Sequence, residues 1–174
     1  TFTTYAELTV SFFTYDINGE PVTSMEGGTF NGATEQGQTF DIAIGTSLIG
    51  FIKTTPGFVF SHFEIGGQVQ PHGIVMPSEA TTLAVFFDRN AYILETHIKS
   101  IGADEILRDH DEGGAIYADY SITFGDKGTL NLVATIGYQI EGIYLDEACT
   151  ILAPNFEEQM QATQEIIDYD KLCQ

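Results

Sequence analysis

Two segments of this 174-residue chain share one spacing of glycine and aromatic residues, and this internal repetition limits the fold more than any other feature. The segments are residues 45–67 and 125–147, and each position of the first pairs with one 80 residues later. Each copy then ends in an apolar strand followed by an acid, at 82–88 and 165–171. The repetition predicts two tandem small domains, residues 1–88 and 92–174, joined by a linker at 88–91. The anchoring pairs are Gly45 with Gly125, Gly57 with Gly137, Phe58 with Tyr138, and Phe63 with Ile143.

Strand-like segments dominate the first copy, because β-branched and aromatic residues alternate there with polar ones. An Asn-Gly pair within residues 16–20 predicts a hairpin turn. Residues 103–112 and 155–163 favour two short helices. The fold class is therefore mainly β (α+β), with a small, mainly antiparallel sheet in each copy. The strands expected in the first copy are 6–15, 39–44, 48–54, 58–65 and 82–87.

The charge of the chain restricts its partners. Six basic residues face twenty-five acidic ones, which gives a net charge of −19. Such a surface repels nucleic acid and anionic membranes, so neither is an expected partner. No run of eighteen apolar residues is present, so we expect no membrane insertion.

The segment "TIGYQIEGIYLDEACTILAP", residues 135–154, carries a resemblance to a known family. It resembles the Listeria–Bacteroides repeat of bacterial cell-surface proteins, which is related to the B repeats of internalins. Gly137-Tyr138 matches the glycine-aromatic pair of that repeat, 142–144 stands where the repeat has its Gly-Trp and tyrosine, and 146–150 matches the turn that follows. The first copy resembles a sister version over residues 55–67 and 76–87. The chain contains no tryptophan, and Phe63 and Ile143 occupy the tryptophan positions.

The resemblance implies two tandem β-grasp-like antiparallel repeats from an extracellular, multi-repeat protein of the cell surface. In such proteins the repeats act as spacers, stalks or adhesive modules and carry no catalytic residues or cofactors. Their partners would be neighbouring repeats, other surface proteins, or a host protein or glycan. An assembly subunit, such as a virion decoration protein or an extracellular filament protein, is the alternative from a different class. We expect Phe63 and Ile143 to be equivalent core residues in strands, one in each copy.

The best cation candidate is the acidic segment 108–114, where Asp109, Asp111 and Glu112 precede a glycine. Alternating oxygen ligands followed by a glycine turn are typical of a calcium loop. The distal bidentate glutamate of such a loop is missing, because Ala118 stands seven positions beyond Asp111. The pattern therefore favours an acidic loop over a metal site.

Other reactive residues are scattered along the chain. The four histidines lie far apart, and Ser61 and His62 should point to opposite faces of a strand. The glycine-rich segment 26–32 lacks the lysine of a phosphate loop and is expected to be a plain loop. Cys149 follows two acids, which would raise its thiol pKa, so a structural role in an Asx turn at Asp146 is favoured. Whether Cys149 pairs with Cys173 stays open at this point.

Overall fold

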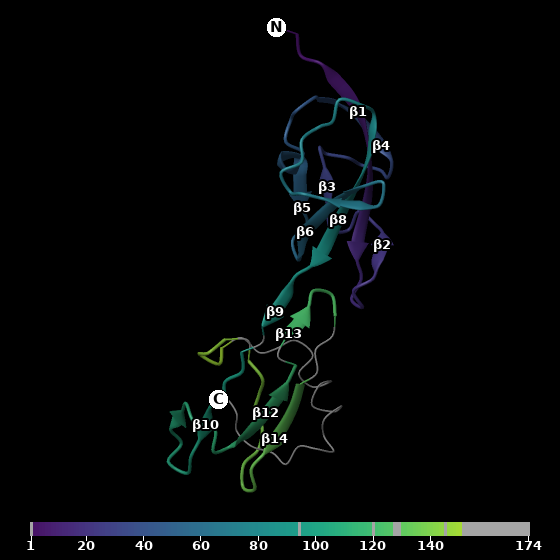
Figure 1. Cartoon of the computed structure of the whole chain (residues 1–174). Coiled ribbons are helices and arrows are strands. Elements are labelled where there is room, and N and C mark those ends of the chain that lie inside the picture. The colour runs from purple at the N-terminus through teal and green to yellow at the C-terminus, as the bar shows by residue number, and fades with distance from the viewer. Residues whose placement is uncertain (1, 94, 120, 127–129, 145, 151–174) are drawn as a thin grey trace. The chain divides into compact units, whose positions relative to one another are not determined.

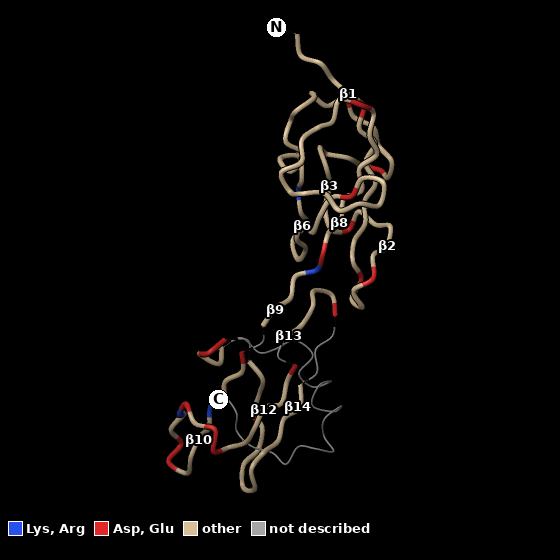
Figure 2. Tube along the Cα trace, in the orientation of Figure 1, with Lys and Arg blue, Asp and Glu red and all other residues tan. Residues whose placement is uncertain are grey.

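The computed structural model describes residues 2–93, 95–119, 121–126, 130–144 and 146–150, and these residues are mainly β. The chain divides into two compact units (Figure 1). The first unit comprises Thr1–Tyr92 together with Thr123–Asp126, and the second comprises Ile93–Ile122 and Lys127–Gln174. Figure 2 shows acidic residues on many different elements, whereas basic residues are few. Among the described residues, no helix has the length and apolar character needed to cross a membrane.

The strands of the first unit alternate with short turns, and the helical content described there is one 3-10 turn. The elements of the first part of the chain are β1 Tyr5–Tyr15, β2 Pro21–Thr23, β3 Gly28–Phe30, β4 Gln38–Ala43, η1 Ile49–Phe51, β5 Ile52–Thr54, β6 Phe58–Ile65, β7 Gln68–Gln70 and β8 Thr81–Arg89. Those that follow are β9 Ala91–Ile93, β10 Ser100–Ile101, β11 Leu107–Arg108, β12 Gly114–Ala118, β13 Ser121–Thr123 and β14 Leu130–Ala134.

The main sheet of the first unit has the strand order β2-β1-β8-β6-β7, and β4 also pairs with β1. Strand β1 pairs antiparallel with β4 along its first half and with β2 at its end. Its other edge pairs with β8 in parallel, from Leu8 with Thr81 to Thr14 with Phe87. The expectation of mainly antiparallel sheets is therefore wrong for this central pair. A parallel pair needs a long crossover, and the chain from β2 to β7 provides it.

The core of the first unit lies on one face of this sheet. Alternate residues of β1 and β8 are fully buried, as period-two strands require. Phe63 of β6 is fully buried opposite Val85 of β8, so its predicted role as a core residue is confirmed. The fully buried apolar residues of the cluster are Leu8, Val10, Phe12, Phe30, Leu48, Phe63, Leu83, Val85 and Phe87.

The second unit has a smaller core among its described residues. Leu132 and Ile140 are buried, and Ile143 packs against them while remaining half-buried. Ile143 also lies outside the strands. The predicted equivalence of Phe63 and Ile143 is therefore wrong in detail, because Ile140 takes the more buried position.

Three local expectations are corrected. Residues 103–112 form no helix, because Glu105 adopts φ +60 in a turn and Leu107–Arg108 forms β11. Residues 48–54 begin with the 3-10 turn rather than a strand. Only Asn90 separates β8 from β9, so 88–91 is no loop-like linker. The helix expected at 155–163 lies outside the described residues.

The first half of each unit contains the same hairpin, displaced by 86 residues. Thr14 pairs with Val22 in the first unit, and Ser100 pairs with Arg108 in the second. The hairpin turns close with matching bonds. The amide of Gly19 donates to the Asp16 carbonyl at 3.1 Å, and the amide of Glu105 donates to the Gly102 carbonyl at 3.0 Å.

Later turns recur with the 80-residue displacement that the sequence predicts. The Phe58 amide donates to the Thr55 carbonyl, and the Tyr138 amide donates to the Thr135 carbonyl, both at 3.0 Å. The intervening glycines are left-handed in both turns, with φ +93 at Gly57 and +96 at Gly137. Two further pairs of bonds match: Thr46 to Ala43 with Asp126 to Thr123, and Thr55 to Gly27 with Thr135 to Gly113.

The change of displacement falls between these regions. Gly28 pairs with Thr54 across β3 and β5, and Gly114 pairs with Ala134 across β12 and β14. The first partner of each pair is displaced by 86 residues and the second by 80. The second copy is therefore six residues shorter in the segment between them.

Candidate functional site

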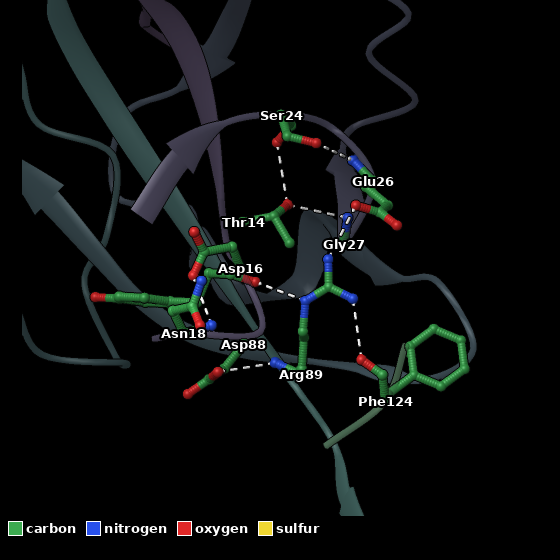
Figure 3. Close-up of polar contacts among 10 residues, drawn as sticks. Thr14, Asp16, Asn18, Ser24, Glu26, Gly27, Asp88, Arg89 and Phe124 are labelled. Carbon is green, nitrogen blue, oxygen red and sulfur yellow. Dashed lines mark hydrogen bonds and ion pairs between the residues drawn. The ribbon is translucent and has the colours of Figure 1, made fainter. Parts of the chain in front are cut away.

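A buried hydroxyl closes a tight turn in the first unit. Thr14 Oγ1 donates to the Ser24 carbonyl at 3.2 Å and accepts a bond from the Gly27 amide at 3.1 Å (Figure 3). Thr14 is fully buried, so both bonds replace water for groups that solvent cannot reach. The hydroxyl thereby ties β1 to the turn that leads into β3.

The second unit contains the same arrangement with a serine. Ser100 Oγ donates to the His110 carbonyl at 2.9 Å and accepts from the Gly113 amide at 3.1 Å. Ser100 is 1% exposed. In both units the hydroxyl precedes its carbonyl partner by ten residues and its glycine partner by thirteen. We call this pair of bonds the hydroxyl clasp.

The hydroxyl clasp accounts for the acidic segment that suggested calcium. Asp111 and Glu112 lie in the turn that Ser100 closes, and the Asp111 carbonyl accepts from the Gly114 amide at 3.2 Å. The first unit has the same bond from Gly28 to Met25, without an acid at that position. Asp109, Asp111 and Glu112 are all exposed. Within the described residues, no group of three or more His, Cys, Asp or Glu side chains is arranged to hold a metal ion.

Arg89 is the hub of the largest polar cluster in the first unit (Figure 3). Its Nε donates to the Tyr15 carbonyl at 2.9 Å, and Nη1 donates to the Phe124 carbonyl at 3.0 Å. Nη2 lies 3.2 Å from Glu26 Oε2, and the guanidinium lies 5.1 Å from the centre of the Phe58 ring. The side chain is only 12% exposed.

The Arg89 cluster is arranged for structure rather than anion binding. A guanidinium presents five N–H donors in a fixed plane. Those of Arg89 point to two backbone carbonyls and one carboxylate of the protein itself, so its charge is already matched. The cluster therefore joins the end of β1, the turn at Glu26 and the segment Thr123–Asp126 within the first unit.

Ser61, His62 and Glu64 form a hydrogen-bonded chain on β6. Ser61 Oγ lies 2.9 Å from His62 Nδ1, and His62 Nε2 lies 3.0 Å from Glu64 Oε1. The expectation that Ser61 and His62 face opposite sides is wrong, because the register with β8 shifts between Phe60 and His62. Such a bulge breaks the strict alternation of a strand.

The surroundings of this chain are aromatic. The His62 ring stacks on Phe86 at 4.4 Å, and Phe86 stacks on Phe13 at 4.8 Å. Burial, followed by the charges of Asp88 and Glu64, raises the pKa of Tyr15 on this side of the sheet. A Ser–His–Glu chain could polarise the serine hydroxyl, but acyl transfer also requires donors placed around a reacting oxyanion. The geometry here establishes only the hydrogen-bonded chain.

The turn around Cys149 agrees with the structural interpretation of that residue. Asp146 Oδ1 accepts from the Thr150 amide at 3.0 Å, and Asp146 Oδ2 lies 2.6 Å from the Thr150 hydroxyl. The expected Asx-type turn at Asp146 is confirmed. Cys149 is half-buried in a left-handed conformation with φ +58, and it is not a free thiol. Cys173 lies outside the described residues.

Comparisons with known proteins identify no relative. No family model matches the chain, and no significant match was found among curated proteins or solved structures. The functional argument therefore depends on the geometry of the two units.

Sequence reasoning missed the residues that organise both units. It gave no role to Thr14, Ser100 or Arg89. One signal for the hydroxyl clasp was present, because Glu-Gly-Gly occurs at 26–28 and again at 112–114. That recurrence has the 86-residue displacement and lies outside the segments aligned at 80.

Proposed function

We propose that the chain is a non-enzymatic repeat module of an extracellular bacterial surface protein, in which it acts as a structural spacer or adhesive module. Each copy would be a β-grasp-like unit built around a strand pair like β1 and β8. Its partners would be neighbouring repeats, other surface proteins, or a host protein or glycan. The observation that carries the proposal is the recurrence of one set of backbone-shaping bonds in both units.

The kinds of residue that recur support a structural role. Both units keep the hydroxyl clasp and the glycine turns, with Thr14 and Gly27 in one and Ser100 and Gly113 in the other. The Ser61–His62–Glu64 chain has no such counterpart, because Glu141, Gly142 and Tyr144 stand 80 residues later. Whatever the two copies do in common therefore requires their backbone geometry and not this polar chain.

Light scattering coupled to size-exclusion chromatography tests the proposal against an assembly subunit. At about 10 μM, below the usual range of weak transient association, a spacer module should elute as a monomer of 19.1 kDa. An assembly subunit, such as a virion decoration or filament protein, should form a stable oligomer at the same concentration. A stable oligomer would overturn the proposed role.

A further inference from the structure

A phenyl ring rests directly on a glycine inside the first unit. Phe124 lies so close to Gly57 that a Cβ at Gly57 would be 2.5 Å from the ring. The ring also meets Phe58 edge to face, with centroids 5.3 Å apart. The backbone of Phe124 is held on both sides, because its amide donates to the Asn90 carbonyl at 2.8 Å and its carbonyl accepts from Arg89 at 3.0 Å. We call Gly57-Phe58 the glycine cradle and Phe124-Gly125 the corner that docks on it.

The first copy contains the same corner 80 residues earlier, at Ile44-Gly45. The Ile44 amide donates to the Thr4 carbonyl at 2.9 Å, which matches the bond of Phe124. Gly45 and Gly125 share a φ of +83. Ile44 is 36% exposed, and a Cβ at Gly45 would meet no atom within 4 Å. A second apolar side chain, Tyr5, lies 60% exposed on β1, where it starts the pairing with β4 that ends beside Ile44.

The second copy contains the same cradle 80 residues later, at Gly137-Tyr138. The turn bond and the left-handed glycine are those of Gly57-Phe58, as described above. At Gly137, however, a Cβ would meet no atom within 4 Å, whereas at Gly57 it would overlap a phenyl ring. Ile136, directly before this glycine, is 91% exposed. One chain therefore presents an apolar corner with open space beside it and a glycine cradle with open space above it.

We propose that the Ile44-Gly45 corner of one copy docks on the Gly137-Tyr138 cradle of a second copy, as Phe124 docks on Gly57-Phe58. This inference rests on the proposed function of a repeat module. The two surfaces differ, so the contact is heterologous and leads to open head-to-tail chains rather than closed dimers. The contact is small and is weak between free copies. It becomes effective when copies are tethered, because a short linker gives a local concentration in the millimolar range.

Sedimentation equilibrium of the whole chain from about 10 μM to about 1 mM tests the docking, in about 0.5 M NaCl to screen the like charges of the copies. The average mass of the wild type should rise with concentration and pass beyond that of a dimer. Ile44→Asp on the corner and Ile136→Asp beside the cradle should each lower the association constant at least tenfold. Both side chains are exposed, so neither change should impair folding. Val69→Asp is the matched control, because Val69 is 66% exposed on β7, outside both surfaces, and should leave association unchanged.

Mixing the two variants tests the direction of the contact. Ile44→Asp keeps its cradle and Ile136→Asp keeps its corner, so the mixture should form one-to-one dimers and nothing larger. Docking is overturned if the wild type stays monomeric at about 1 mM, if it stops at a dimer, or if Val69→Asp is as disruptive as Ile44→Asp. Those results leave the repeat-module proposal in place. A stable oligomer at about 10 μM that survives both changes would instead overturn that proposal.

Discussion

The hydroxyl of Thr14 offers the sharpest test of what holds the first unit together. Changing Thr14 to valine keeps the shape of the side chain and removes only the hydroxyl. The Gly27 amide then loses its acceptor and the Ser24 carbonyl loses its donor (Figure 3). Because Thr14 is fully buried, water cannot replace either bond without opening the core.

The expected cost follows from these two bonds. Leaving a buried donor or acceptor without its partner costs about 1 to 3 kcal/mol. Changing Thr14 to serine keeps the hydroxyl and deletes one methyl group, which costs about 1 kcal/mol. We therefore expect Thr14→Val to be more destabilising than Thr14→Ser, although valine is the more apolar residue at a buried site.

Urea unfolding followed by circular dichroism measures both changes. A loss of about 2 kcal/mol should lower the midpoint of the first unit by about 1 M urea, for the slope of a small domain. Ser100→Ala is the reciprocal control and should lower the midpoint of the second unit instead. If Thr14→Val costs no more than Thr14→Ser, the hydroxyl clasp does not stabilise the turn and the reasoning fails.

Three further predictions concern the cores, the charges and calcium. Phe63→Ala should cost about 3 to 5 kcal/mol in urea unfolding and the half-buried Ile143→Ala only about 1 to 2, and equal losses would contradict the burial described here. The bond to Arg108, followed by the Ile106 amide, lowers the pKa of Asp104 from 3.8 to about 2. Its stabilising effect is therefore complete above pH 4 and lost as the pH falls towards 2, so melting curves of Asp104→Asn and wild type should differ at pH 7 and converge near pH 2. Calcium up to about 1 mM should leave the melting temperature unchanged, and a saturable rise that Asp111→Asn abolishes would establish a site in the acidic segment.

Local turn chemistry was the most predictable part of the fold. The Asn-Gly turn at 16–20 forms as expected, with the Asn18 amide donating to Asp16 Oδ1 at 2.9 Å. The glycine-aromatic spacing located the paired turns at Gly57 and Gly137. Left-handed backbone in these turns favours glycine, so the residue type itself carries the signal.

Pairing and register were not predictable in the same way. Strand β1 shows the same alternation whether its partner runs parallel or antiparallel, so the pairing with β8 depends on the whole chain path. The bulge that brings Ser61 to His62 leaves no mark in the alternation of residues 58–65. The role of Arg89 was hidden for a similar reason, because its acceptors at Tyr15 and Phe124 are far away in sequence.

The charge balance of the chain explains how the basic residues are used. With six basic and twenty-five acidic residues, ion pairs cannot neutralise most of the carboxylates. The described basic groups instead bond repeatedly to carbonyl oxygens: Arg89 to Tyr15 and Phe124, Arg108 to Ile106, and Lys99 to Glu147.

The uncompensated acids keep free copies apart in dilute solution at low salt, since like charges repel over about a Debye length. Contacts between copies must then be short-ranged and apolar. Isoleucine at the corner and glycine in the cradle satisfy that requirement, because neither adds charge and the glycine lets a side chain approach the backbone. Tethering supplies the encounter that electrostatics oppose, and a repeat module of this kind would hold its geometry within a chain of copies while remaining a monomer when released.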